Sequence, residues 1–211
     1  MSKEQQQQGA SRRRLRGEER RALILHSAKH VFARSSYAEA STGELARESE
    51  VTEPMLYKHF GSKKGLFLAV LREFGRQFLH LLQERISRRA EKDVLDALAH
   101  LIDDYRATIK ADPEIQRILF QAVIESSDPE IASCVSEHNR TVYGLIRQLI
   151  ERAHQDDYLD PAISLDVATW GYMSMILAIQ YSLMLHLSAD VFQAQEEVNR
   201  VWLRGLRARE S

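Results

Sequence analysis

The polar side chains best placed to bind another molecule lie between Ser41 and Lys63, in the stretch STGELARESEVTEPMLYKHFGSK. Hydroxyl, carboxylate, imidazole and ammonium groups dominate its second half, where apolar residues are few. Such groups hydrogen-bond to base edges and pair with phosphates, which is how proteins read duplex DNA. The side chains expected to point outward are Thr52, Glu53, Met55, Tyr57, Lys58 and His59. This stretch therefore predicts a DNA-binding surface.

Two short helices joined by a tight turn would position these side chains. The apolar residues that would bury one narrow stripe of each helix are Leu45, Ala46, Val51, Leu56 and Phe60. Ser41 or Thr42 is a suitable N-cap for the first helix, and the hydroxyl and amide groups there also suit a phosphate. Thr52 caps the second helix, which has Pro54 in its first turn and ends at Gly61. This arrangement is typical of a helix-turn-helix, whose second helix enters the major groove.

The flanking sequence predicts a helix on each side of this motif. Apolar residues recur at steps of three and four over residues 18–35, and again over residues 63–88, where Ser62 is the N-cap. Residues 1–17 contain a glutamine run and a cluster of four arginines between Arg12 and Arg16, but no apolar period. They predict a disordered arm. This arm either contacts DNA phosphates or the minor groove, or serves as a solubilising tail.

Charge is distributed unevenly along the 211 residues, although the net charge is only −1. Residues 1–89 contain 18 Lys and Arg against 10 Asp and Glu, whereas the remainder contains 11 against 20. A basic half is expected of a polyanion-binding region, and an acidic half would be repelled by the same polyanion. Residues 1–89 are therefore expected to bind the polyanion, and the remainder is expected to point away from it and to have another function.

A family resemblance rests on several residues of the motif and of the helix that follows it. They are Leu45-Ala46, Val51, Leu56-Tyr57, His59-Phe60, Lys63 and Leu66-Phe67. With the amphipathic helix before them, they resemble the tetracycline-repressor (TetR) family of bacterial transcriptional regulators, over about residues 20–71. The resemblance implies an all-α fold with three DNA-binding helices in residues 18–62. Residues 63–211 would then begin with a long connecting helix and form a domain that dimerises and binds a small ligand.

The resemblance also implies roles for individual residues. Those expected near bases or backbone are Thr42, Glu53, Pro54, Met55, Tyr57 and His59. Tyr57 and Lys63 would contact phosphates, and Lys58 could read either bases or backbone. Two departures from the family pattern stand out. Ser49-Glu50 replaces the usual Ala-Gly at the turn, so Glu50 must adopt a positive φ or the turn differs. Glu53 places a carboxylate beside DNA, where cytosine N4 could donate to it but phosphates repel it.

The second half of the sequence is helical in pattern throughout. The helices expected there span residues 94–109, 115–125, 129–154, 161–187 and 189–209, which gives about nine in all and no strand. The helix at 161–187 is apolar nearly all round, so it needs cover on more than one side. That requirement predicts a homodimer, in line with the family, whose last two helices form a bundle between subunits. A twofold dimer places its recognition helices about 34–36 Å apart, which matches a palindromic operator.

Aromatic and apolar residues near the middle of this half predict a small-molecule cavity. The candidate ligand-binding residues are Phe78, Tyr105, Phe120, Gln121, Ile124, Tyr143, Trp170, Met173, Leu177 and Tyr181. For each of them taken singly, ordinary core packing is the better explanation, but together they predict a hydrophobic effector with few polar anchors. No clustered carboxylates or histidines point to a metal, and no cofactor is expected. Release from DNA on ligand binding is the default for the family, and co-repression is the alternative.

Other classes of protein receive less support. The sequence has no metalloprotease, phosphate-loop or nucleophile-elbow motif, so an enzyme is not expected. His26 and His30 are four residues apart but lack a third ligand, and the single cysteine, Cys134, reads as a buried side chain. Composition, one cysteine and no secretory signal predict a cytoplasmic protein that does not span a membrane. The rival hypothesis is a helical protein-interaction or membrane-surface module that uses the arginine cluster.

Overall fold

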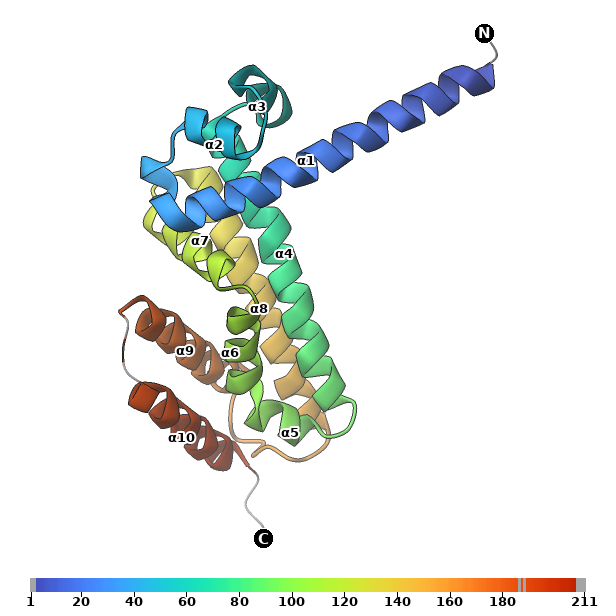
Figure 1. The fold of residues 1–211 in the computed structure, drawn as a ribbon. Coiled ribbons are helices and arrows are strands. Elements are labelled where there is room, and N and C mark those ends of the chain that lie inside the picture. Colours follow the sequence, from blue (N-terminus) through green and yellow to red (C-terminus); the bar gives the residue numbers. More distant parts are fainter. Residues whose placement is uncertain (1–2, 186, 188, 208–211) are drawn as a thin grey trace.

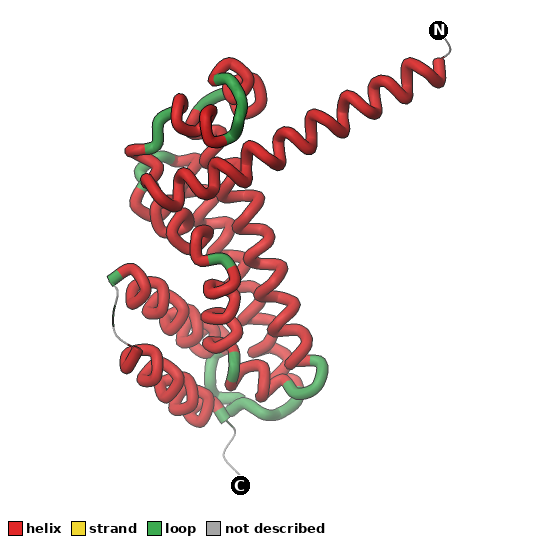
Figure 2. Tube along the Cα trace, in the orientation of Figure 1, coloured by secondary structure: helices red, strands yellow, loops and turns green. Residues whose placement is uncertain are grey.

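A computed structural model describes residues 3–185, 187 and 189–207, with the backbone alone for residues 3–16 and 189–192. These residues form ten helices (Figures 1 and 2). The helices are α1 (Lys3–Glu39), α2 (Thr42–Glu48), α3 (Glu53–Phe60), α4 (Lys63–Ala90), α5 (Val94–Ala99), α6 (Leu101–Ala111), α7 (Pro113–Ile124), α8 (Pro129–Gln155), α9 (Leu165–Met184) and α10 (Ala189–Leu206). Over the described ranges the only extended pairing is an isolated bridge between Leu159 and Arg207. The predicted all-α class is confirmed.

The tenth helix arises because the predicted helix at 94–109 is divided at His100. This residue has φ −108° and ψ 9°, and it ends α5 while preceding α6. Its backbone N–H donates to the Asp96 carbonyl, and its own carbonyl accepts from the Asp104 N–H, so both helix ends remain paired. A break of one residue leaves the apolar period almost unchanged, which is why the sequence pattern does not reveal it.

Several helix boundaries differ from those that the sequence predicts. Helix α9 begins at Leu165, because Ser164 caps it and residues 160–163 form a turn closed by the Ile163 N–H and the Asp160 carbonyl. Helix α10 ends at Leu206, and the predicted end at Arg209 lies outside the described residues. The predicted break after residue 35 coincides with Ser36, whose φ of 67° interrupts the regular path of α1.

The arm that the sequence predicts to be disordered has a helical backbone in the structure. Helix α1 continues through residues 3–17, and Figure 1 shows its N-terminal half extending away from the other helices. Glutamine, alanine and arginine all have favourable helix propensities, so a helix can form there without an apolar contact. The side chains of residues 1–16, including the arginine cluster, lie outside the described part of the chain.

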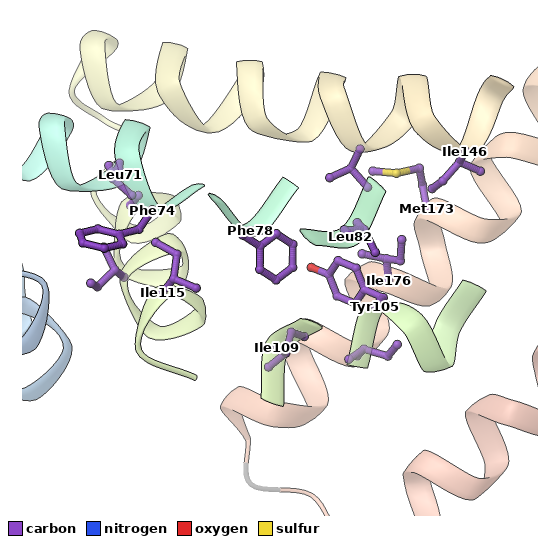
Figure 3. Packing of buried hydrophobic residues seen from close by; sticks show 14 of the residues in the cluster. Leu71, Phe74, Phe78, Leu82, Tyr105, Ile109, Ile115, Ile146, Met173 and Ile176 are labelled. Carbon is purple, nitrogen blue, oxygen red and sulfur yellow. The ribbon is translucent and has the colours of Figure 1, made fainter. Parts of the chain in front are cut away.

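Helix α4 is the central element, and it carries the connection between the two ends of the molecule. It contacts α1 and α3 near its start and α5, α6, α7 and α8 along its length. Phe74, Phe78 and Leu82 follow one another along its buried face, and Figure 3 shows Phe78 and Leu82 beside Tyr105 of α6. Each fully buried side chain of this size contributes about 1.5–3 kcal/mol to stability. A shift of any of these helices therefore changes the packing against α4.

Helices α9 and α10 leave an apolar stripe uncovered. Its exposed residues are Val167, Trp170, Val198 and Val201. The two helices lie side by side, and Gly171 permits the close approach, because a Cβ at that position would lie 2.1 Å from the Trp202 ring. None of the described helices combines the length and hydrophobicity needed to cross a lipid bilayer. Insertion of α9 or α10 across a membrane therefore does not explain why these apolar side chains are exposed.

Candidate DNA-binding surface and ligand cavities

Helices α2 and α3 are held together by a short turn with a strained residue. Ser41 caps α2 by accepting from the Glu44 N–H at 3.1 Å. Glu50 has φ 51°, so this residue does adopt the left-handed conformation that glycine usually supplies in related turns. The Val51 N–H then donates to the Ala46 carbonyl at 3.0 Å and closes the turn. The local geometry of a helix-turn-helix is thus reached without the glycine.

Four of the eight residues of α3 are exposed to solvent, and three more are half-buried. Leu56 is its only buried residue. Thr52, Glu53, Pro54, Tyr57 and Lys58 are exposed, whereas Met55 and His59 are half-buried. The side chain of Tyr57 is 44% exposed. A helix that buries one leucine and exposes a hydroxyl, a phenol and an ammonium is suited to lie in a groove lined by hydrogen-bonding groups.

Two of the predicted DNA-binding residues bind each other. The Thr42 hydroxyl donates to Glu53 Oε2 at 2.8 Å, which joins the start of α2 to the start of α3. The carboxylate of Glu53 is therefore engaged within the protein, and Thr42 presents its backbone rather than a free hydroxyl. This pairing gives a physical reason for an acidic residue on a surface expected to approach phosphates.

Lys63 is also engaged within the protein. Its ammonium group donates to the carbonyls of Tyr37, Ala38 and Ala40 at 2.9, 3.3 and 3.0 Å, and it lies 4.9 Å from the centre of the Tyr37 ring. All three of its protons are thereby directed at the end of α1, where carbonyls lack helical partners. The role of phosphate contact, which the family resemblance implies, would require some of these bonds to break.

We therefore expect Lys63→Met to lower the free energy of unfolding by about 1.5–3 kcal/mol, the usual contribution of hydrogen bonds to a charged group. Urea denaturation followed by circular dichroism measures this change. The control is Lys58→Met, because Lys58 is exposed and should affect DNA affinity without affecting stability. Equal stability of the two variants would show that the hydrogen bonds from Lys63 to the end of α1 contribute nothing to the free energy of unfolding.

Gly65, which no sequence motif marks, fixes the junction of α3 and α4. Ser62 caps α4 by accepting from the Gly65 N–H at 2.9 Å, and Gly61 just before it has φ 75°. A Cβ built on Gly65 would lie 2.0 Å from the Phe60 carbonyl oxygen. Only glycine fits there, and no pattern in a single sequence distinguishes it from a helical glycine that fits by chance.

Helix α1 is tied to α7 by a cluster of polar contacts. Lys29 pairs with Asp112 at 2.9 Å and with Glu114 at 3.4 Å. His30 Nδ1 lies 2.6 Å from Glu114 Oε1. Burial raises the pKa of the Glu114 carboxyl, but the bond to His30 and the charge of Lys29 outweigh it and lower the pKa overall. Helix α1, which also contacts α2, is thereby attached to the second half of the chain.

The histidine pair noted in the sequence takes part in this joint. His26 Nε2 lies 3.1 Å from His30 Nε2, and the two rings meet edge to face. Across the described residues, no group of three His, Cys, Asp or Glu side chains is arranged to hold a metal ion. The geometry fits a contact between helices α1 and α7.

Two neighbouring hollows lie beside α7. One, of about 200 Å³, lies between α7, α8 and α9, and the other, of about 480 Å³, lies between α1, α6, α7 and α9. Gln116, Phe120 and Gln180 line both of them. A wider groove of about 620 Å³ runs between α4 and α8 and shares His138 with the first hollow. The hollow of about 480 Å³ has the size of a small-ligand site, and most of its lining residues are apolar.

The predicted ligand-binding residues are only partly brought together. Those that line the hollows are Phe120, Gln121, Leu177 and Tyr181. Those that belong to the buried core are Phe78, Tyr105 and Met173. Ile124 and Trp170 are 66% and 55% exposed, and the Tyr143 hydroxyl donates to Asp166 at 3.0 Å. These three lie elsewhere because an apolar period cannot tell a helix face that meets a cavity from one that meets solvent or a partner.

His138 is a lining residue that the sequence did not single out. Burial lowers its pKa from 6.5 to about 4, so the imidazole is neutral at physiological pH. Its ring lies 5.9 Å from that of Phe78, and its Nε2 is buried without a hydrogen-bond partner among the described residues. An uncharged polar group thus separates the α4–α8 groove from the first hollow.

This shift predicts a loss of stability in acid. Because the unfolded chain binds a proton at His138 below about pH 6.5 and the folded chain does not until about pH 4, stability falls across that window. At pH 5 the contribution is about 2 kcal/mol, from 1.36 kcal/mol per pKa unit. Urea denaturation at pH 7 and pH 5 should show a smaller loss in His138→Gln than in the parent protein. His80→Gln, at the exposed edge of the same groove, should leave the loss unchanged.

Comparison with known proteins identifies relatives of the DNA-binding helices. Residues 24–70, from α1 to the start of α4, match a family described as bacterial regulatory proteins, tetR family. The transcriptional activator FasR of Mycolicibacterium smegmatis is 29% identical over 146 residues, which cover 68% of this chain. The matched region spans 65% of FasR, a little under two thirds of that relative.

Solved structures share the fold over nearly the whole chain. A TetR-family transcriptional regulator from Mesorhizobium loti has a TM-score of 0.77 at 17% identity, and the match covers 92% of this chain and 99% of that one. The regulator FadR of Bacillus subtilis, solved in complex with stearoyl-CoA, has a TM-score of 0.71 at 15% identity and covers 88% and 99%. At these identities the similarity establishes the arrangement of helices.

Proposed function

We infer that this chain, a transcriptional regulator of the TetR family, binds a palindromic DNA operator as a homodimer and leaves it when a small hydrophobic ligand binds. The observation that carries the proposal is the exposure of α3, which buries only Leu56 and lies within the region that matches the family. In this reading Tyr57, Lys58 and Thr52 face the DNA. The DNA-binding part comprises residues 18–62, and the remainder serves dimerisation and ligand binding.

A homodimer is supported by the uncovered stripe on α9 and α10. Val167, Trp170, Val198 and Val201 are each more than half exposed, which is unusual for large apolar side chains on neighbouring helices. In a twofold dimer the stripe of one protomer would pack against the same stripe of its partner, so each would bury the other. Most dimers have an isologous interface of this kind. Two copies of α3 would then meet two half-sites.

A ligand-controlled DNA affinity is supported by the position of the hollows. They lie against α7, and α7 is joined to α1 through Lys29, His30 and Glu114. A ligand that favours one arrangement of these helices shifts the protein toward it by no more than its difference in affinity for the two states. We propose repression with release by ligand, although FasR is named as an activator. We propose no catalytic activity, and we place the protein in the cytoplasm with the chromosome.

Sequence selection from a random duplex library at about 150 mM salt tests the proposal, since purely electrostatic binding is weak there. We expect one palindromic motif, and Tyr57→Ala should lose it while the variant stays helical and dimeric. Tyr57→Phe removes only the hydroxyl and should weaken binding by roughly 3- to 10-fold.

Binding to every duplex without preference would contradict the proposal and favour the rival module that uses the arginine cluster. Vesicles that contain anionic lipid are the matching test for that alternative. A regulator should bind them weakly at the same salt concentration, whereas the rival module should bind them regardless of Tyr57.

A further inference from the structure

One side chain, Gln121, touches both a ligand-sized hollow and the DNA-binding helices. It lines the 480 Å³ hollow between α1, α6, α7 and α9, together with Gln116, Phe120 and Gln180. Its Nε2 donates to the backbone carbonyl of Phe32 in α1 at 2.8 Å. Phe32 lies one turn before Ser36, whose φ of 67° interrupts the regular path of α1. Gln121 therefore binds the backbone of α1 just before this break, from the opposite half of the molecule.

The bond to Phe32 fixes the orientation of the Gln121 amide. Only the NH₂ group can donate to a carbonyl, so the other end of the amide is the oxygen. This Oε1 is buried and has no hydrogen-bond partner among the described residues. A buried acceptor without a partner costs free energy, because it has lost its hydrogen bonds to water. A neighbouring group that donates to it recovers part of that cost. Gln116 Oε1, in the same wall, is also buried without a hydrogen-bond partner among the described residues.

The remaining lining sets the chemistry of a suitable ligand. Ala33, Ile109, Leu183 and Met184 are apolar, and among the described residues the only charged one in the lining, Arg117, is exposed. No carboxylate of the described residues lines the hollow to neutralise an ammonium group, and a carboxylate on the ligand would face the two unpaired amide oxygens. A neutral molecule with a hydroxyl or N–H donor meets both conditions.

We propose that this hollow takes a neutral, mainly apolar molecule that donates a hydrogen bond to Gln121 Oε1, and that Gln121 transmits its binding to α1. The proposal rests on the ligand-controlled function above. Because Oε1 is covered in this structure, the side chain must rotate to accept the bond. That rotation moves Nε2 away from the Phe32 carbonyl and removes this contact between α7 and α1. The ligand thus binds better to the state in which the contact is broken, which is what a coupling between sites requires.

Two isomeric probes test the ligand chemistry on the free protein. Decan-1-ol has a hydroxyl donor, whereas nonyl methyl ether has the same formula and no donor. Displacement of an apolar dye such as Nile red should show that the alcohol binds roughly 3- to 10-fold more tightly, as one neutral hydrogen bond implies. Decanoate is the charged comparison and should bind more weakly than the alcohol. Equal binding of alcohol and ether, or tighter binding of decanoate, would overturn the proposed ligand class.

Variants test the assignment to Gln121. Gln121→Met keeps the length of the side chain and removes both polar atoms, so it should bind alcohol and ether equally. Gln116→Met changes the same wall without a bond to α1, and it should keep a preference for the alcohol. If Gln116→Met alone removes the preference, the assignment to Gln121 is wrong.

The coupling is measured with the selected operator. The alcohol should weaken operator binding by the parent protein, and it should have little effect on Gln121→Met even at saturating dye displacement. Coupling that survives in Gln121→Met would contradict the transmission through Phe32. A protein that prefers the alcohol but selects no operator would refute the proposed function and leave the ligand site in place, so the two failures are distinguishable.

Discussion

Gly65→Ala is expected to unfold the junction of α3 and α4 and to abolish operator binding. The added Cβ would lie 2.0 Å from the Phe60 carbonyl oxygen and 3.2 Å from the carbon that bears it, and neither atom can move without displacing the end of α3. Overpacking against backbone costs more than the usual 1–3 kcal/mol, so we expect a loss of roughly 3 kcal/mol or more. Thermal unfolding and operator affinity measure the two effects.

The matched control is Gly144→Ala, because Gly144 is also helical and its added Cβ would meet no atom within 4 Å. Alanine is a better helix former by up to about 1 kcal/mol, so this variant should be slightly more stable and should bind the operator normally. A Gly65→Ala variant as stable as the parent would mean that α4 begins with a different geometry from the one described.

Val201→Glu is expected to convert the homodimer into monomers. Val201 is 66% exposed, so a glutamate there costs little in a single chain. In the proposed dimer the same carboxylate would be buried against the partner's copy of the stripe, and an unpaired buried charge is strongly unfavourable. Two linked half-site contacts gain about 10²- to 10⁴-fold in affinity over one, and the monomer should lose that gain. Light scattering after gel filtration and operator titration measure both changes.

Ile124→Glu is the matched control. Ile124 is also 66% exposed but lies at the end of α7, away from the stripe on α9 and α10. It should stay dimeric and bind the operator with unchanged affinity. Monomers in both variants would show that the interface is elsewhere or larger, and dimers in both would contradict the proposed interface.

The sequence predicted the helix-turn-helix well because its signals are local. Ser41, Thr52, Pro54 and Gly61 mark helix ends through their own backbone preferences, and α2 and α3 begin and end beside them. The turn at Glu50 was predicted as a choice between two geometries, and the structure adopts the positive φ. Such features depend on residues a few positions apart, so one sequence contains them.

The cavities were predicted poorly because they depend on contacts between distant helices. Gln121 reaches a carbonyl 89 residues away, and nothing near it in the sequence marks that bond. His138 looks like any helical histidine until its burial beside Phe78 is known. Lys63 resembles a DNA contact in its motif, yet its partners are backbone carbonyls at the end of α1, which no side-chain pattern records.

The hydrophobic core described along α4 is one continuous cluster that runs from Ile24 in α1 to Leu206 in α10. A shared core makes the molecule a single cooperative unit, so heat or denaturant should unfold residues 18–62 and the helices that follow in one transition. Loss of packing far from α3 therefore lowers the fraction of molecules able to hold an operator. For the same reason, a substitution that loosens the core in the second half of the chain should weaken operator binding even at a position that touches neither of the proposed binding sites.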